Sequence, residues 1–149
     1  MGISEIIKGR QVYLDTNIFI YAFEGYPAHV SFLQELFTAI DEGKFVSFTS
    51  ELTLAELLVK PLIDKKNQLA ESYINTLQTT SSLVLLPVTR GILITAAKIR
   101  SEYNRHLKLP DAIHLASAQQ HGCETFLSND RQLALFKGID VVILDDLLS

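Results

Sequence analysis

Four acidic residues stand out because of the segments in which they lie. Asp15 and Asp130 each follow a short apolar run typical of a β-strand, whereas Glu56 and Asp111 lie in segments with helical spacing. Carboxylates that converge in a partly dry cleft repel one another, so they need cations or shifted pKa values to coexist. Mg2+ and Mn2+ prefer such oxygen ligands, and paired ions of this class hydrolyse phosphodiester bonds. The pattern therefore indicates a metal-dependent hydrolytic site.

Each acid also has a purely structural explanation. Asp15 and Asp130 could cap the helices that follow them, and Asp111 could stabilise a helix amino terminus through the helix dipole. Glu56 could complete a capping box begun by Thr53. Caps are scattered over a protein, however, whereas the topology expected here brings four acids to one end of one sheet. This combination favours a shared site.

The segments that carry the acids belong to an alternating pattern of apolar strands and longer helices, which predicts βαβ units around a parallel sheet. In such sheets ligands bind at the carboxyl ends of the strands. Pro110 can open one of the helices and Gly122 can close it. We expect one α/β domain over residues 1–149, with a central five-stranded parallel sheet and helices on both faces. The expected strands are Val12–Leu14, Phe45–Phe48, Leu83–Leu86, Thr125–Leu127 and Val141–Leu144.

The composition restricts the location and the chemistry of the protein. The 149 residues are 48% hydrophobic, which is enough for one packed core. No apolar run approaches the ~20 residues needed to cross a bilayer, and Lys8 and Arg10 interrupt the early apolar residues, so no signal peptide or membrane span is expected. The single cysteine, Cys123, excludes an internal disulfide and suits a reducing cytosol. We expect a cytoplasmic protein without membrane contact.

The basic residues bear on the partner. A net charge of -4 at first argues against a polyanion, but bound metal would neutralise several acids. Lys98, Arg100, Arg105 and Lys108 also gather just before Asp111. Arg105 and Lys108 are the preferred candidates for binding a phosphodiester backbone, although a solvated helix face would look the same.

One histidine and two aromatic residues lie close to the acids in sequence. His114 follows Asp111 by one helical turn, so it could orient that carboxylate or touch the substrate. The favoured interpretation is that His114 fills a half-buried helix face. Tyr13 and Phe19 have apolar neighbours and are expected in the core.

Four motifs in the right order resemble those of PIN-domain ribonucleases, especially the VapC-type toxins of bacterial and archaeal toxin–antitoxin systems. The resemblance covers almost the whole chain. An apolar strand leads into Asp15-Thr16-Asn17, and Ser128-Asn129-Asp130 carries a Ser where Thr is more usual. The two helical motifs are Leu52–Leu58, which contains Glu56, and Leu109–Ala118, which contains Asp111.

The resemblance implies a PIN-like three-layer αβα sandwich and a ribonuclease that needs Mg2+ or Mn2+. Water would attack the phosphorus in line and leave 5′-phosphate and 3′-hydroxyl products. It also implies RNA as substrate, an antitoxin partner and a homodimer. The residues implied to be catalytic and metal-binding are Asp15, Glu56, Asp111 and Asp130. Those implied to hydrogen-bond the acids or the substrate are Thr16, Asn17 and Ser128.

The same residues bear on other functions. A receiver domain would need an early pair of adjacent acids and a late strand-end Lys, and neither is present. A haloacid-dehalogenase-like phosphatase would need a second Asp where Asn17 stands. A catalytically weak PIN domain that only binds RNA is disfavoured because all four acids are present. A DNA-directed nuclease stays open, because its metal chemistry would be the same.

Overall fold

Five parallel strands form the central sheet of this computed structural model, which describes residues 2–148. Their spatial order is β3-β2-β1-β4-β5, and every neighbouring pair is parallel. The predicted five-stranded parallel sheet is therefore confirmed. The strands are β1 (Gln11–Leu14), β2 (Val46–Ser50), β3 (Leu83–Leu86), β4 (Thr125–Ser128) and β5 (Asp140–Ile143).

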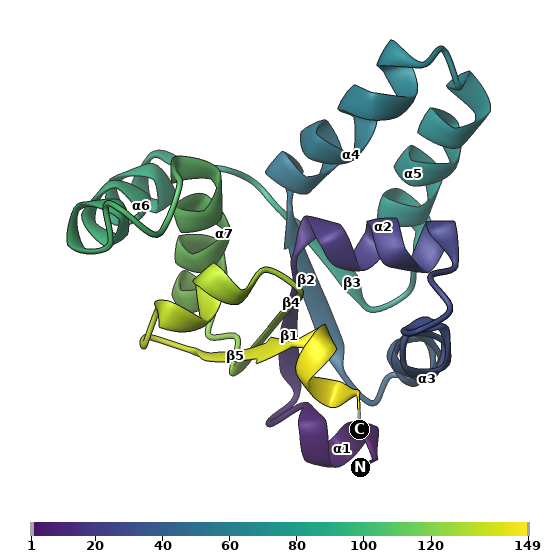
Figure 1. Cartoon of the computed structure of the whole chain (residues 1–149), viewed down its shortest axis with the longest axis horizontal. Coiled ribbons are helices and arrows are strands. Elements are labelled where there is room, and N and C mark those ends of the chain that lie inside the picture. The colour runs from purple at the N-terminus through teal and green to yellow at the C-terminus, as the bar shows by residue number, and fades with distance from the viewer. Residues whose placement is uncertain (1, 149) are drawn as a thin grey trace.

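Helices cover both faces of this sheet (Figure 1). Helices α2, α3 and α5 lie on one side and α6 and α7 on the other, which gives the expected three layers. The α-helices of residues 2–148 are α1 (Ile3–Ile6), α2 (Thr16–Glu24), α3 (Val30–Asp41), α4 (Glu51–Ile63), α5 (Asn67–Thr79), α6 (Arg90–Glu102) and α7 (Leu109–Gln120). Two short 3-10 helices follow, η1 (Arg131–Leu135) and η2 (Leu144–Leu147).

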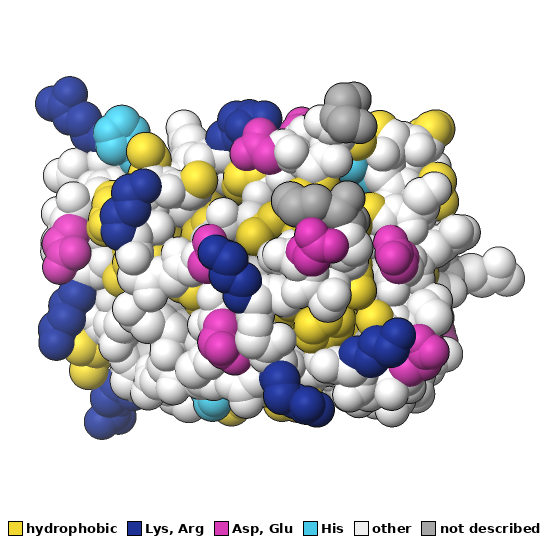
Figure 2. Space-filling view, turned by 90° about the horizontal axis from the view of Figure 1, so that it is seen from below, with side chains coloured by type: hydrophobic (Ala, Val, Ile, Leu, Met, Phe, Trp, Pro, Cys, Tyr) yellow, Lys and Arg dark blue, Asp and Glu magenta, His cyan; other side chains and the backbone are white. Residues whose placement is uncertain are grey.

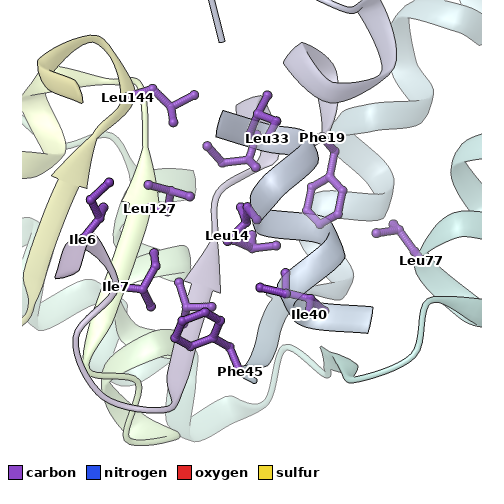
Figure 3. Packing of buried hydrophobic residues seen from close by; sticks show 14 of the residues in the cluster. Ile6, Ile7, Leu14, Phe19, Leu33, Ile40, Phe45, Leu77, Leu127 and Leu144 are labelled. Atoms are coloured by element: carbon purple, nitrogen blue, oxygen red, sulfur yellow. The ribbon is translucent and has the colours of Figure 1, made fainter. Parts of the chain in front are cut away.

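Alternation along the central strands builds a hydrophobic core on each face. Val12 and Leu14 of β1 point into the cluster beneath α2 and α3, part of which is drawn in Figure 3. Tyr13 points to the other face and stacks on Phe126 of β4, with ring centroids 4.9 Å apart. Burial on both faces is typical of parallel sheets and explains why apolar side chains point to both faces of β1.

The strand order fixes where a site can form. The chain proceeds outward from β1 through β2 to β3, and then crosses to the other side of β1 to form β4 and β5. Such a reversal leaves a crevice outside the carboxyl ends of the two central strands. Asp15 directly follows β1, and Asn129 alone separates Asp130 from the end of β4. Both acids therefore lie at this crevice.

The ends of α7 agree with the sequence pattern. Pro110 lies in the first turn of the helix, and Gly122 lies just beyond its end with a φ of 71°, the left-handed conformation that glycine adopts at low cost. Cys123, the next residue, is buried, and burial raises the pKa of its thiol to about 12.

The surface carries charges of both signs. On the face shown in Figure 2, Lys and Arg side chains alternate with Asp and Glu side chains over the whole area. Charges on this face are therefore interspersed rather than gathered by sign. Among residues 2–148, no helix combines the length and the apolar character that crossing a membrane requires.

We expect Gly9→Ala to destabilise the fold more than Gly43→Ala. Both glycines have left-handed backbones, with φ of 74° and 75°, so either alanine costs about 1–2 kcal/mol. At Gly43 the space is open, but a Cβ at Gly9 meets the Glu124 carboxyl group, which accepts a hydrogen bond from the Arg10 N–H. Breaking that bond adds about 1 kcal/mol. Urea unfolding of both variants measures the difference; equal destabilisation would contradict it.

Candidate active site

Asp15 is the central acid of the site. Its side chain is 9% exposed and caps the amino terminus of α2, where the Thr16 N–H donates to Oδ1 at 2.8 Å. Oδ2 accepts hydrogen bonds from Ser128 Oγ at 2.7 Å and from Asn17 Nδ2 at 3.4 Å. Asp15 therefore does cap α2, as its structural explanation states. The additional side-chain donors show that the carboxylate is also held from β4.

Ser128 and Asn17 link Asp15 to the segment that carries Asp130. Ser128 Oγ accepts a hydrogen bond from the Asp130 N–H at 3.0 Å and another from Asn17 Nδ2 at 3.2 Å. Asn17 Oδ1 accepts from the Asn129 N–H at 3.1 Å. Asp130 itself caps η1 by accepting from the Gln132 N–H at 3.1 Å. The turns after β1 and β4 are thus fixed to each other.

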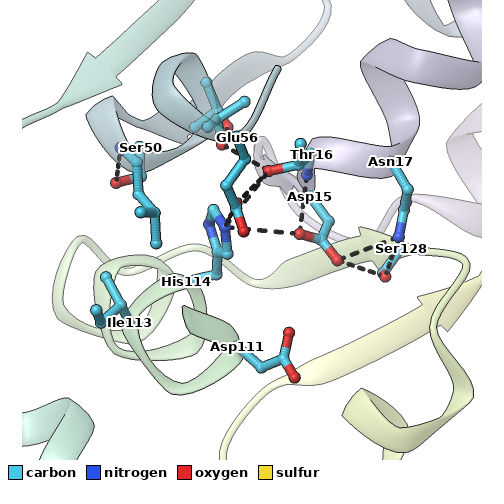
Figure 4. A network of polar contacts seen from close by, with 12 residues as sticks. Asp15, Thr16, Asn17, Ser50, Glu56, Asp111, Ile113, His114 and Ser128 are labelled. Atoms are coloured by element: carbon cyan, nitrogen blue, oxygen red, sulfur yellow. Dashed lines mark hydrogen bonds and ion pairs between the residues drawn. The ribbon is translucent and has the colours of Figure 1, made fainter. Parts of the chain in front are cut away.

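Glu56 reaches the site from α4. That helix is capped by Ser50, whose Oγ accepts from the Leu52 N–H, so Thr53 lies inside the helix and the capping-box explanation of Glu56 is wrong. Glu56 Oε1 instead accepts hydrogen bonds from Thr16 Oγ at 2.8 Å and from His114 Nε2 at 2.7 Å (Figure 4). These bonds and the His114 charge lower the pKa of Glu56 despite its partial burial.

His114 joins the site from α7 and is its least exposed titratable residue apart from Tyr13, at 2%. Its Nδ1 lies 2.7 Å from Tyr13 Oη, and its Nε2 lies 3.9 Å from Asp15 Oδ1 in addition to the Glu56 contact. Burial disfavours the imidazolium, but the Glu56 hydrogen bond and the nearby carboxylates outweigh it and raise the pKa of His114.

Sequence reasoning missed this role of His114. The favoured interpretation, a half-buried residue that fills a helix face, is wrong, because the ring is fully buried and bonded at both nitrogens. Its hydrogen-bonding partner is Glu56 rather than the adjacent Asp111. Tyr13 is in the core as expected, yet its hydroxyl serves the site. The one available signal was that His114 shares a helix face with Asp111.

Asp111 completes the set from the first turn of α7. Its Oδ2 accepts from the Lys108 N–H at 3.4 Å. Burial raises the pKa of Asp111, and the negative charges of Asp130 and Asp15 raise it further. Figure 4 places its carboxylate near Asp15, on the side away from α4. The charges of Asp15 and Asp130 therefore act on Asp111, and His114 links Glu56 to Asp15.

The two predicted basic residues lie in the loop between α6 and α7. Both Arg105 and Lys108 are exposed, and the backbone of Lys108 contacts Asp111. Lys108 therefore lies at the edge of the acidic group, and Arg105 precedes it by three residues in the sequence.

The donor chemistry fits a hard divalent cation. All four acids offer carboxylate oxygens, and the pKa of Asp111 is raised by burial and then by the nearby charges of Asp130 and Asp15, both of which a cation would offset. Within residues 2–148, no three His, Cys, Asp or Glu side chains are arranged to hold one metal ion together. Mg2+ typically uses only one or two carboxylates and retains several waters. Asp15, Glu56, Asp111 and Asp130 are the residues from which one or two such ligands would come.

We expect Asp111→Asn to stabilise the metal-free protein at pH 7.5. The pKa of Asp111 is higher in the folded than in the unfolded state, so the folded state binds more protons and loses stability as pH rises through the folded pKa. The amide removes this cost. Urea unfolding in EDTA should show the gain at pH 7.5 and a smaller gain at pH 4. A variant less stable than wild type at pH 7.5 would contradict a cost of ionising Asp111 in the folded protein.

Solved structures of toxin–antitoxin proteins are similar to this chain. A chain of a toxin–antitoxin complex from Klebsiella pneumoniae is 27% identical, with a TM-score of 0.67 and coverage of 89% of this chain and 97% of that chain. A chain of FitAcB from Neisseria gonorrhoeae is 21% identical, with a TM-score of 0.70 and coverage of 91% and 99%. VapC20 of Mycobacterium tuberculosis, described as a sarcin-ricin loop cleaving toxin, is 16% identical, with a TM-score of 0.63 and coverage of 77% and 86%.

The two structures below 25% identity show a shared fold alone. No curated protein sequence is significantly similar to this chain. The sequence model of the PIN domain, however, matches residues 12–139. That segment contains Asp15, Glu56, Asp111 and Asp130 and extends from β1 to the start of β5. The resemblance inferred from the four motifs is therefore confirmed, and the chain belongs to the PIN-domain family, a family of nucleases.

Proposed function

We propose that this protein is an endoribonuclease that depends on Mg2+ or Mn2+. The observation that carries the proposal is the coupled group of carboxylates at the carboxyl ends of β1 and β4, where Asp15 and Asp130 disfavour the charge of Asp111. Asp15 and Asp130 also cap helices, but capping alone does not require the carboxylates to gather, and the group needs positive charge to be stable. Binding of a cation and of a phosphodiester backbone would explain why the carboxylates are gathered there.

The side chains divide the work at this site. Asp15, Glu56, Asp111 and Asp130 hold the cation, which when bound lowers the pKa of an attacking water and offsets charge on the phosphate. Ser128 and Asn17 fix one oxygen of Asp15, and the Thr16 N–H fixes the other. These bonds preorganise the carboxylate before substrate arrives, which lowers the reorganisation that the reaction requires.

RNA is the proposed substrate, and Arg105 and Lys108 are proposed to bind its backbone. Both are exposed on the loop that leads into α7, so they can contact phosphates that flank the scissile bond. Support for RNA over DNA comes from the structurally similar VapC20, which is described as cleaving the sarcin-ricin loop, an RNA element.

We further propose that the protein is the toxin of a toxin–antitoxin pair and forms a homodimer. The Klebsiella pneumoniae structure supports the pairing, since it is a toxin–antitoxin complex of which one chain matches nearly the full length of this one. An antitoxin would then silence the nuclease by binding it directly.

Asp15→Asn and Asp111→Asn should each reduce RNA cleavage by at least ~100-fold, because cation-based charge stabilisation contributes several kcal/mol to the transition state. The measurement is cleavage of labelled RNA with Mn2+ or Mg2+, and EDTA should abolish it. Asp41→Asn is the matched control, since Asp41 ends α3 and is exposed outside the site.

The same assay separates the alternatives. Labelled DNA of the same sequence should be cleaved much more slowly, and faster cleavage of DNA would make the protein a DNA nuclease. RNA that is bound but left intact with either metal would identify a binding module. Cleavage that persists in EDTA or in Asp15→Asn would refute the metal mechanism.

Arg105→Ala and Lys108→Ala should weaken RNA binding and flatten its salt dependence. Removing one phosphate-binding side chain should reduce the slope of log affinity against log salt by about 0.7 for a single strand. Fluorescence anisotropy over a series of KCl concentrations measures the slope. Lys44→Ala is the control, because Lys44 pairs with Glu42 before β2, at the amino ends of the strands. Equal slopes in all variants would rule out this RNA path.

A further inference from the structure

We propose that His114 is a positioning residue that fixes the Glu56 carboxylate for metal binding. The inference deepens the proposed function and rests on it. His114 contacts no predicted substrate group; it acts through Glu56, to which Nε2 is bonded at 2.7 Å. The ring is 2% exposed and both of its nitrogens have hydrogen-bond partners, so its burial leaves neither nitrogen unsatisfied.

The chemistry of Glu56 fixes the direction of its hydrogen bond with His114. An ionised carboxylate only accepts, so Nε2 must carry the hydrogen and donate to Glu56 Oε1. At Nδ1 the Tyr13 hydroxyl, 2.7 Å away, donates to the neutral ring and accepts from the imidazolium. In either form Tyr13 supports a ring whose Nε2 hydrogen points at Glu56. The same logic orients histidines and carboxylates around metal sites in general.

The anchor behind His114 is rigid. Tyr13 is completely buried in β1, and its ring stacks on Phe126 with an interplanar angle of 13°. The Glu56 side chain, by contrast, is 35% exposed on α4, a helix that extends away from the sheet (Figure 1). Without His114, the Thr16 hydroxyl would be the one hydrogen-bond donor left to Glu56 among the described residues. The His114 bond therefore adds a link from the fixed position of β1 to a partly exposed carboxylate.

The bonds also divide the work between the two Glu56 oxygens. Thr16 and His114 both donate to Oε1. Among the described residues, no hydrogen bond is made to Glu56 Oε2, so this oxygen can bind a cation. Nε2 also lies 3.9 Å from Asp15 Oδ1, so one ring nitrogen faces both carboxylates. His114 thus sets both the orientation of Glu56 and its spacing from Asp15.

Two amide variants separate positioning from packing. The His114→Gln amide can reach the place of Nε2 and donate to Glu56, whereas the shorter His114→Asn amide can reach only the place of Nδ1 and Tyr13. The readout is the affinity for Mn2+ alone, from the EPR signal of free Mn2+ without RNA. We expect His114→Asn to lower this affinity about 10–100-fold and His114→Gln to restore most of it. For RNA cleavage, kcat should fall in His114→Asn while KM stays unchanged.

Several outcomes would overturn the inference. One is that His114→Asn binds Mn2+ with the affinity of the wild-type protein. Another is that both amide variants lose Mn2+ affinity equally, since this would mean that only packing matters. Wild-type protein that binds no Mn2+ would refute it together with the proposed function. Wild-type protein that binds Mn2+ but leaves RNA intact would refute the function alone.

A second variant covers the case in which His114→Asn does not fold, which far-UV circular dichroism and urea unfolding would reveal. Tyr13→Phe keeps the stacked ring and removes only the hydroxyl that anchors Nδ1. It should lower Mn2+ affinity in the same direction and leave the KM for RNA unchanged. Unchanged Mn2+ affinity in a folded Tyr13→Phe protein would overturn the proposal.

Discussion

Repulsion among carboxylates gathered in one crevice is the constraint on which the rest of this structure depends. The chain tolerates it because two hydrophobic clusters, one on each face of the sheet, provide stability elsewhere. It also supplies donors wherever a carboxylate is buried: Ser128, Asn17 and the Thr16 N–H surround Asp15, and His114 meets Glu56. Functional sites commonly break the rules that govern the remainder of a fold, and here the violation is electrostatic.

The sheet topology explains why the acids meet although they are far apart in sequence. The central strand β1 has β2 on one side and β4 on the other, so the turns that follow these strands are neighbours. Helix α4 starts directly after β2, and α7 packs beside α6 on the face opposite α2. Side chains from both layers of helices therefore reach the same end of the sheet. The site is a product of strand order more than of any single motif.

The sequence was informative where function depends on local pattern. An apolar run followed by Asp15 or Ser128-Asn129-Asp130 identifies a strand and its end, and this placed the acids at the correct edge of the sheet. It was uninformative where function depends on which helices meet. His114 and Glu56 are separated by 58 positions, and nothing in either segment specifies that α7 should face α4. The role of the Tyr13 hydroxyl could not be predicted for the same reason, because an apolar neighbourhood predicts burial but not the partner of a buried oxygen.

The pairing of β1 with β4 also bears on synthesis. Asp15 emerges early from the ribosome, but Ser128, which holds its carboxylate, lies 113 residues further along the chain. Parallel pairing over such separations forms slowly, because a long loop must close before the contact is rewarded. The nascent polypeptide therefore cannot assemble the acidic crevice until most of its length has been translated. In a chain with this topology, Asp15 gains its hydrogen bond from β4 only once Ser128 has been synthesised.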